Sequence, residues 1–211
     1  EKKAREALEK FGDDLKNEYR TPDPDVTLCV ESAAPTVLPM TKADSEKVVT
    51  LLTCMPNGLI ELSMDVAGLP QTSLNLGILT TSENEVSASF CVRSSVSSQK
   101  EMLKKRLTRM TALLGGTVSY FGEYPAWEFK SDSPILKLCA DVYEKKFGKK
   151  PVITAIHGGL ECGLFSEKMP GLDCVSFGPD IFDIHTPREK LSVSSLNRTW
   201  EFLLEVLKEM K

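Results

Sequence analysis

Long hydrophobic runs, paired cysteines and an excess of positive charge are all missing from this sequence of 211 residues. No apolar stretch approaches the roughly 18 to 20 residues that a membrane-spanning helix needs, and no signal-peptide pattern opens the chain. The formal net charge is −4, and no basic stripe is present that would bind a phosphate backbone. We therefore expect that neither a membrane nor a nucleic acid is a partner of this protein.

Cysteine motifs are missing as well, because the six cysteines are scattered and form no CxxC pair. Several of them lie within apolar strand or helix patterns, where a free cysteine behaves as a small buried hydrophobic residue. Disulfides are rare in reducing compartments, so the pattern favours a cytoplasmic protein without disulfides or cysteine metal ligands. The cysteines are Cys29, Cys54, Cys91, Cys139, Cys162 and Cys174.

What is present is an ordinary globular composition, with 41% hydrophobic and 27% charged residues. A chain of this length can bury a core without disulfides or metal ions, as one large domain or two small ones. Glu1 lies inside a helical pattern, with neither an initiator methionine nor a capping residue before it. We expect that the chain is part of something longer.

The first 121 residues follow a pattern of amphipathic helices and alternating strands. We expect helices at residues 1–19, 44–55 and 98–114, and strands at residues 26–30, 59–64, 73–79, 85–93 and 117–121. Ser98 and Glu101 have the spacing of a capping box, and Gly115 and Gly116 supply a left-handed stop after the third helix. Helices on one face of an antiparallel sheet predict an α+β sandwich of ferredoxin-like type.

The turn-forming run at residues 122–127 marks the expected boundary between two domains. Beyond it we expect a helix from Pro134 to Gly148 with its cap at Asp132 or Ser133, a strand at 152–156, a short helix at 162–166, a strand at 172–177 and a terminal helix from Ser192. This alternation predicts part of a parallel or mixed three-layer sheet. Two strands rarely form a stable sheet alone, so the sheet needs further strands.

Each of the two histidines has a functional and a structural interpretation. His185 lies on a polar loop after an expected strand, with Glu189 four residues later. It is either a metal ligand whose ring a neighbouring carboxylate orients, or a surface histidine beside acidic residues. His157 ends an apolar strand directly before two glycines, so it either positions a substrate or is a partly buried histidine with its hydrogen bonds satisfied.

Three further features suit a substrate that carries an anionic group. Gly158 and Gly159 precede a short helix and can present backbone N–H groups, and Glu161 at the helix start is either functional or a cap. Arg93 ends a strand, where a guanidinium either grips a carboxylate through two hydrogen bonds or faces solvent. Asn75 interrupts a strand pattern with a residue that strands disfavour, which suggests a positioned amide.

These motifs resemble a known family in segments spread over essentially the whole chain. The segments are residues 59–64, 72–77, 92–94, 124–127, 156–165, 178–179 and 185–189. They are similar to the zinc-dependent metallopeptidases that include the aminoacyl-histidine dipeptidases, carnosinases, tripeptidase T and carboxypeptidase G. The run from His157 to Phe165 is the most specific of these segments.

The resemblance implies an α+β and α/β fold in two parts. Residues 1–121 would form most of a ferredoxin-like α/β sandwich, the lid domain through which such enzymes often dimerise. Residues 122–211 would form the C-terminal part of a three-layer α/β/α zinc-peptidase catalytic domain.

The resemblance also implies roles for the candidate residues. His185 matches a zinc ligand, supported by Glu189. Arg93 and Asn75 match lid residues that hold the C-terminal carboxylate of the substrate. Gly159 and Glu161 belong to a glycine-rich substrate loop that follows His157.

No catalytic residue is assigned within this sequence, because the family's general base and other zinc ligands match no segment of it. We expect a fragment of a cytosolic dipeptidase that is inactive alone and that, when complete, hydrolyses Xaa-His and other dipeptides with water activated by two zinc ions. Manganese or cobalt are alternatives to zinc. The expected partners are a dipeptide substrate and a second copy bound through the lid. The alternative function is a non-catalytic interaction or dimerisation module.

Overall fold

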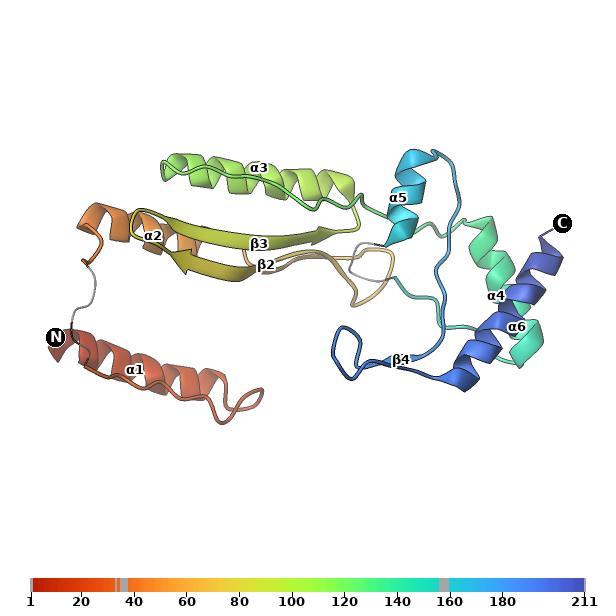
Figure 1. Cartoon of the computed structure of the whole chain (residues 1–211), viewed down its shortest axis with the longest axis horizontal. Helices are drawn as coiled ribbons and strands as arrows, with labels where there is room; N and C mark the ends of the chain where they lie inside the picture. Colours follow the sequence, from red (N-terminus) through yellow and green to blue (C-terminus); the bar gives the residue numbers. More distant parts are fainter. Residues whose placement is uncertain (1, 33, 35–37, 156–159, 211) are drawn as a thin grey trace. The chain divides into compact units, whose positions relative to one another are not determined.

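The computed structural model describes residues 2–32, 34, 38–155 and 160–210 (Figure 1). It divides into two compact units, Glu1–Ser45 and Glu46–Lys211, and each is described by itself. None of the helices in the described part of the chain is long and apolar enough to cross a membrane.

The first unit consists of an amphipathic helix and a segment that returns along it. The helix α1 (Lys2–Glu18) confirms the predicted one. An added Cβ on Gly12 would lie 3.5 Å from the Leu28 side chain, so the returning segment passes close to this helix. Arg5 donates hydrogen bonds to the Val30 carbonyl (3.2 Å) and the Ser32 hydroxyl (3.3 Å). The predicted strand at 26–30 is wrong, because helix side chains rather than a second strand hold this segment.

A three-stranded antiparallel sheet organises the first part of the second unit. The strands β1 (Gly58–Leu62), β2 (Pro70–Thr81) and β3 (Val86–Ser94) lie in that order, and the β2–β3 hairpin is the predicted one. The helices α2 (Lys42–Cys54) and α3 (Ser97–Leu113) confirm two further predictions. One core joins these elements through the buried side chains of Met55, Leu74, Leu103 and Leu107. Burial of each such side chain contributes about 1.5–3 kcal/mol.

The start of α3 differs from the sequence prediction. The capping box of Ser98 and Glu101 is wrong, because both residues already lie inside the helix and Val96 occupies the N-cap position. The Ser94 hydroxyl accepts a hydrogen bond from the Val96 N–H (3.1 Å), which tightens the turn out of β3 and starts the helix early. Glu101 forms an ion pair with Lys104 instead (3.2 Å).

The end of α3 confirms the predicted stop. Gly115 has a φ of 79°, which a residue with a side chain rarely adopts. The Gly116 N–H donates to the Thr111 carbonyl (2.9 Å), and the Gly115 N–H donates to the Ala112 carbonyl (3.0 Å). These two bonds are those of a Schellman motif, so the glycine pair satisfies carbonyls that the helix end leaves free.

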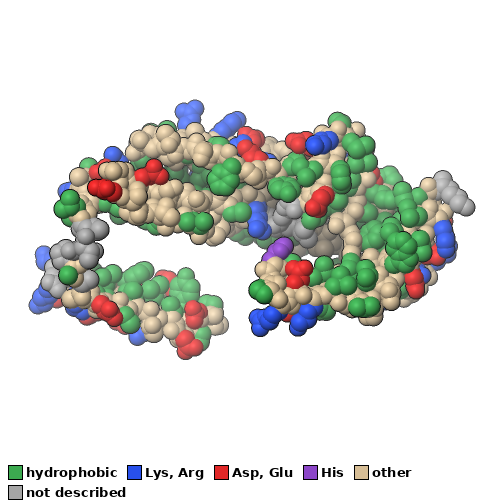
Figure 2. Space-filling view, in the orientation of Figure 1, with side chains coloured by type: hydrophobic (Ala, Val, Ile, Leu, Met, Phe, Trp, Pro, Cys, Tyr) green, Lys and Arg blue, Asp and Glu red, His purple; other side chains and the backbone are tan. Residues whose placement is uncertain are grey.

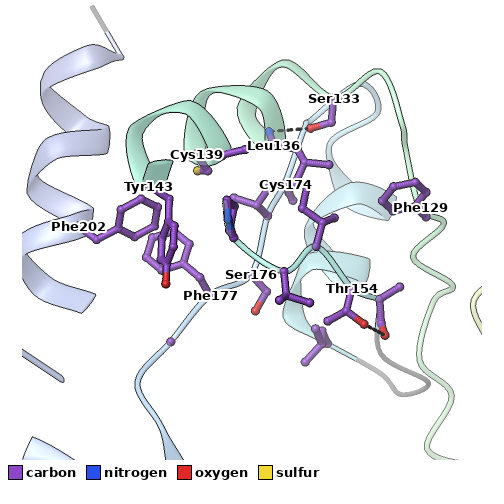
Figure 3. Close-up of a pocket in the computed structure, with 18 of the residues that line it drawn as sticks. Phe129, Ser133, Leu136, Cys139, Tyr143, Thr154, Cys174, Ser176, Phe177 and Phe202 are labelled. Atoms are coloured by element: carbon purple, nitrogen blue, oxygen red, sulfur yellow. Dashed lines mark hydrogen bonds between the residues drawn. The ribbon is translucent and has the colours of Figure 1, made fainter. Parts of the chain in front are cut away.

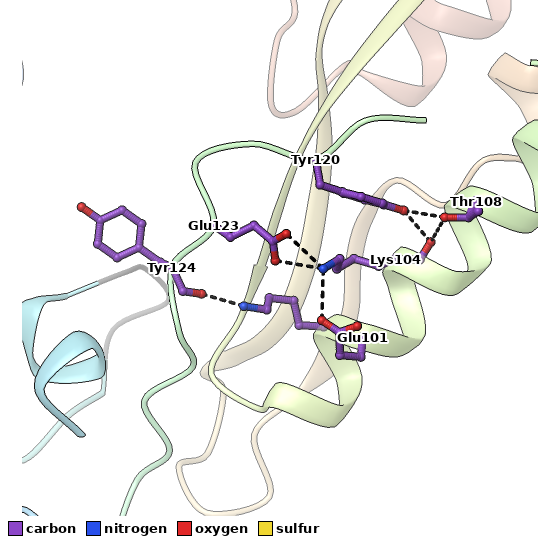
Figure 4. A network of polar contacts seen from close by, with 7 residues as sticks. Glu101, Lys104, Thr108, Tyr120, Glu123 and Tyr124 are labelled. Carbon is purple, nitrogen blue, oxygen red and sulfur yellow. Dashed lines mark hydrogen bonds and ion pairs between the residues drawn. The ribbon is translucent and has the colours of Figure 1, made fainter. Parts of the chain in front are cut away.

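The segment after α3 packs along this helix, so the predicted strand at 117–121 is wrong (Figure 4). Lys104 Nζ lies 2.9 Å from a Glu123 carboxylate oxygen and 4.9 Å from the centre of the Tyr120 ring. The Tyr120 hydroxyl donates to the Lys104 carbonyl (2.7 Å). Hydrogen bonds to Glu123 and Glu101 raise the pKa of Lys104. Helix side chains thus satisfy polar groups of this segment without a neighbouring strand.

Two helices form a second core in the C-terminal part of this unit. They are α4 (Pro134–Phe147) and α6 (Val193–Glu209). The buried side chains are Cys139, Val142, Phe202 and Val206. The predicted cap of α4 is confirmed, since the Ser133 hydroxyl accepts a hydrogen bond from the Leu136 N–H (3.0 Å). Gly148, with a φ of 68°, ends the helix as predicted.

The remaining elements are short: α5 (Glu161–Lys168), β4 (Ile181–Phe182) and β5 (Lys190–Leu191). The mixed α/β class is confirmed, and α5 covers the predicted short helix. The strands predicted at 152–156 and 172–177 are not formed in the described residues 152–155 and 172–177. A strand needs a neighbour for its backbone hydrogen bonds, and these segments meet none within the described chain. Val152 is accordingly 92% exposed.

Candidate functional site

The candidate metal ligand His185 lies in the hairpin loop between β4 and β5, at residues 183–189. The two strands pair in antiparallel register. Within the loop, the Thr186 N–H and hydroxyl both donate to the Asp183 carbonyl (3.2 and 2.7 Å). The Glu189 N–H donates to the Thr186 carbonyl (3.1 Å). The loop therefore has a conformation that its own hydrogen bonds specify.

His185 has an unusual backbone conformation, with a φ of 64°. Residues other than glycine rarely adopt this left-handed region, and such strain is often found at functional sites. The His185 N–H donates a 2.8 Å hydrogen bond to the Glu189 carboxylate. The sequence predicts that Glu189 orients the imidazole ring, whereas this contact holds the His185 backbone. Glu189 thus fixes the conformation from which the exposed imidazole projects.

Asn75 and Arg93 lie on neighbouring strands and share one face of the sheet. Asn75 pairs with Cys91, and Arg93 pairs with Ser73. Paired residues of antiparallel strands point to the same side, and successive residues alternate between sides. Because Leu74 points into the helix-covered core, Asn75 and Arg93 point away from it. Both are exposed, so an amide and a guanidinium lie on one surface of the sheet.

The residues of the glycine-rich run are described only in part. Glu161 is the first residue of α5, and its exposed side chain lies where the helix dipole favours a negative charge. His157 and Gly159, together with Gly158, lie outside the described residues. The structure therefore groups the other candidates as Asn75 with Arg93 and His185 with Glu189, with Glu161 at the start of α5.

Sequence reasoning missed Gly163, which fixes the position of α5. A Cβ at this residue would lie 2.9 Å from the Pro125 carbonyl oxygen and 3.5 Å from the Trp127 Cβ. Only glycine permits so close an approach between a helix and a neighbouring backbone. A glycine inside a short helical pattern was the available signal for this contact.

Asp173 is a second residue that the sequence did not single out. Its carboxylate accepts hydrogen bonds from the Ser133 hydroxyl (2.8 Å) and the Ile135 N–H (3.0 Å) at the start of α4. Partial burial pushes the pKa of Asp173 upward, but the hydrogen bonds from Ile135 and Ser133 and the charge of Lys130 lower it overall. This ionised carboxylate connects the 172–177 segment to the N-terminus of α4.

A cavity of about 550 Å³ lies beside the second core (Figure 3). Its apolar lining includes Leu136, Cys139, Tyr143, Val175, Phe177 and Phe202. Residues 151–155 and 172–178 line it as well, so it lies beside the segments predicted to be strands. An ion pair between Arg198 and Asp180 (3.4 Å) belongs to its polar lining. Apolar space of this size can accept further side chains or a small ligand.

Large apolar side chains are also exposed on α6, and Figure 2 shows hydrophobic surface gathered over the C-terminal helices. Trp200 is 59% exposed and Val193 is 69% exposed. The exposed stripe is Val193, Leu196, Trp200, Leu204 and Leu207. Its spacing of three and four residues lines one side of the helix, away from Phe202 and Val206. Patches of this kind usually mark contact surfaces.

The described residues do not complete a metal site. Within them, no group of three or more histidine, cysteine, aspartate and glutamate side chains could hold a metal ion. A neutral imidazole such as that of His185 suits zinc and other transition metals. Zinc sites in proteins use three or four protein ligands, so His185 alone does not account for one.

Comparisons with known proteins agree with one another. The sequence profile described as peptidase family M20/M25/M40 matches residues 7–209. The cytosol non-specific dipeptidase of Escherichia coli (strain K12) is 35% identical over 196 residues, which are 93% of this chain and 40% of that protein. This chain therefore spans less than half the length of that relative.

Comparisons with solved structures agree with these sequence comparisons. The crystal structure of aminoacylhistidine dipeptidase from Vibrio alginolyticus matches with a TM-score of 0.87 and 34% identity, over 100% of this chain and 43% of that one. The aminopeptidase PepT from Bacillus cereus ATCC 10987 matches with a TM-score of 0.59 and 20% identity, over 78% and 44% of the two chains. The second match concerns the fold alone.

Proposed function

Because this chain belongs to peptidase family M20/M25/M40, we propose that it functions within a cytoplasmic, zinc-dependent dipeptidase that hydrolyses Xaa-His and related dipeptides. The observation that carries this proposal is the match over the full chain to an aminoacylhistidine dipeptidase, at a TM-score of 0.87. The 35% identity to a cytosol non-specific dipeptidase supports the reaction and the compartment. It also supports a substrate range beyond Xaa-His.

His185 is the metal-binding residue in this proposal. Its imidazole suits zinc, and also manganese or cobalt, and Glu189 holds its backbone in one conformation. When bound, zinc ions would lower the pKa of a coordinated water and polarise the scissile carbonyl. The remaining ligands and the general base would come from polypeptide outside these residues, since one histidine is not a complete zinc site.

Substrate binding is assigned to the open face of the sheet and to the start of α5. Arg93 can donate two hydrogen bonds to the C-terminal carboxylate of a dipeptide, and Asn75 on the adjacent strand can donate a third. Glu161, with His157 and Gly159, would form the loop that contacts the rest of the substrate. The positive charge of Arg93 then selects substrates with a free carboxylate.

Residues 1–121 are proposed as most of a lid domain and residues 122–211 as the C-terminal segment of the catalytic domain. The two hydrophobic cores support this division, because the first lies entirely before residue 121 and the second entirely after it. The boundary between the two compact units falls after Ser45 instead, so the proposed division at residue 121 rests on the cores. The apolar cavity, the two unpaired segments and the exposed α6 stripe support a catalytic domain that further strands and helices complete.

Dimerisation through the lid is part of the proposal. In the described sheet, β3 is an edge strand of nine residues. A long edge strand offers backbone groups that a second copy can pair with. Sedimentation of the purified chain would test this, with Ser89→Pro as the variant that should weaken the contact between edge strands.

The function is tested with the 211-residue chain and with the same chain extended by its upstream coding sequence. We expect zinc-dependent hydrolysis of an Xaa-His dipeptide only from the extended protein. In that protein, His185→Ala should lower kcat/KM at least about 100-fold, because loss of a ligand exceeds the 10- to 100-fold effect of losing a group that supports one. Arg188→Ala on the same loop is the control. Rapid hydrolysis by the 211-residue chain alone, or by the His185→Ala variant, would contradict the proposal.

A further inference from the structure

Two cysteines lie near each other beside α5, although one belongs to a predicted helix and the other to a predicted strand. Cys162 and Ser166 are four residues apart on α5, so they share one side of this helix. The Ser166 hydroxyl lies 4.0 Å from the Cys174 sulfur. Cys174 therefore lies against the side of α5 that carries Cys162. Burial raises the pKa of the Cys162 thiol and the neighbouring Cys174 raises it further, which agrees with this placement.

The turn between α5 and this segment holds the pair in place. The Met169 N–H donates to the Phe165 carbonyl (2.8 Å), and the Leu172 N–H donates to the Met169 carbonyl (3.0 Å). On either side of the thiols, Gly163 contacts Pro125 and Asp173 binds the start of α4. Both ends of the contact are thus anchored independently of the thiols.

The setting of the pair differs from that of the other cysteines. Both thiols are partly exposed, whereas Cys139 is buried and Cys29, Cys54 and Cys91 are exposed. Burial raises the pKa of Cys162, and the neighbouring Cys174 and Glu161 raise it further. Cys162 is therefore a thiol rather than a thiolate at neutral pH, and it reacts slowly with oxidants in solution.

We propose that Cys162 and Cys174 are a dithiol modification site, which a disulfide oxidant such as oxidised glutathione converts into an intramolecular disulfide. One cysteine thiolate attacks oxidised glutathione, and one glutathione thiolate leaves. The second cysteine thiolate then attacks the mixed disulfide and releases the second glutathione. The two protein thiols together lose two protons and two electrons. Oxidised glutathione takes up these protons and electrons and becomes two molecules of glutathione thiol.

The effect on activity rests on the proposed function. Cys162 follows Glu161 directly, at the end of the proposed substrate loop. A covalent bond from Cys162 to Cys174 would restrain this end of the loop and leave the His185 hairpin unchanged. Oxidation of the complete enzyme should therefore change KM for the dipeptide and not the zinc affinity.

The bond is tested in a variant without the exposed cysteines: Cys29→Ser, Cys54→Ser and Cys91→Ser. This protein is incubated with oxidised glutathione, and free thiols are counted after denaturation. We expect the loss of two of the three remaining thiols, a mass lower by two hydrogens, and a peptide that joins Cys162 to Cys174. Circular dichroism before and after oxidation confirms that the chain stays folded.

The matched control adds Cys174→Ser to the same background. It should form no internal disulfide and should instead retain one glutathione on Cys162. A joined peptide that contains Cys139, or no thiol loss in the background protein, would overturn the proposal. These readouts are masses and thiol counts, so they remain decisive even if the chain proves to have no part in dipeptide hydrolysis.

Discussion

Single residues in this chain act mainly by holding backbone in position. Glu189 binds the N–H of His185, Asp173 binds the start of α4, and Gly163 allows α5 to approach Pro125. None of these contacts is between neighbours in a regular helix or strand pattern. A substitution at each of these residues therefore tests how a local contact supports an element or a candidate site.

Asp173→Asn should lower the free energy of unfolding by about 1 kcal/mol at neutral pH, because the hydrogen bonds to the α4 N-terminus lose their charged partner. The folded-state pKa of Asp173 is lowered, so this stabilisation is present above the unfolded-state pKa. It is lost as the pH falls through the folded-state pKa. Urea unfolding of both proteins at a series of pH values measures the difference. A difference that stays constant into strong acid would contradict this account.

If the complete protein is the proposed zinc dipeptidase, Glu189→Ala should lower its zinc affinity by about 10- to 100-fold, because His185 loses the contact that fixes its backbone. Glu189→Gln should lose less, since an amide oxygen can accept the same hydrogen bond. Competition with a coloured chelator measures both affinities. Equal losses in the two variants would show that the charge of Glu189, rather than the hydrogen bond, supports the site.

At the scale of elements, α5 and α3 are each positioned by an irregular segment. The 120–124 segment binds α3 through Lys104 and Lys100, whose ammonium group donates to the Tyr124 carbonyl (2.7 Å). α5 rests on the backbone at Pro125, directly after that segment. Residues 120–127 therefore contact both helices.

Gly163→Ala tests the packing of α5. Alanine favours a helix over glycine by about 1 kcal/mol, so propensity alone predicts stabilisation. The added Cβ would lie 2.9 Å from the Pro125 carbonyl oxygen, and overpacking of this kind costs about 1–3 kcal/mol. We expect a net loss of stability in thermal unfolding. Gly178→Ala, where an added Cβ has no atom within 4 Å, is the control and should have little effect.

At the scale of the whole molecule, each compact unit leaves apolar side chains in solvent. In the second unit these gather on α6 and around the cavity beside α4. This chain spans 40% of the length of one relative and 43% of another. Exposed stripes of this kind promote association with other apolar surfaces.

Trp200→Glu should weaken self-association of the 211-residue chain by about tenfold or more, because an exposed tryptophan is a frequent anchor of contacts. Its side chain is 59% exposed and lies away from the core residue Phe202, so the fold should persist. Sedimentation velocity at several concentrations measures the change. Ser194→Glu, on another side of α6, is the matched control, because it adds the same single negative charge at an exposed position. An equal effect of both variants would contradict a specific role for the apolar stripe.

The elements that the sequence predicted well are those that local signals specify. Ser133 with Pro134 starts α4, and Gly115 ends α3, because capping depends on residues within one turn. The predicted strands at 117–121 and 172–177 failed because a strand depends on a neighbour that its own residues do not specify. The sequence alone therefore determined most helices and the long hairpin.

The candidate site likewise has some features that the sequence specifies and others that depend on the tertiary structure. The sequence alone singled out Arg93, Asn75 and His185 by residue type and position. Only the tertiary structure decided that Asn75 and Arg93 share one face, because this follows from the β2–β3 register. It also decided that Glu189 binds the His185 backbone and that Cys174 lies against the side of α5 that carries Cys162, since contacts across a loop depend on how the backbone closes.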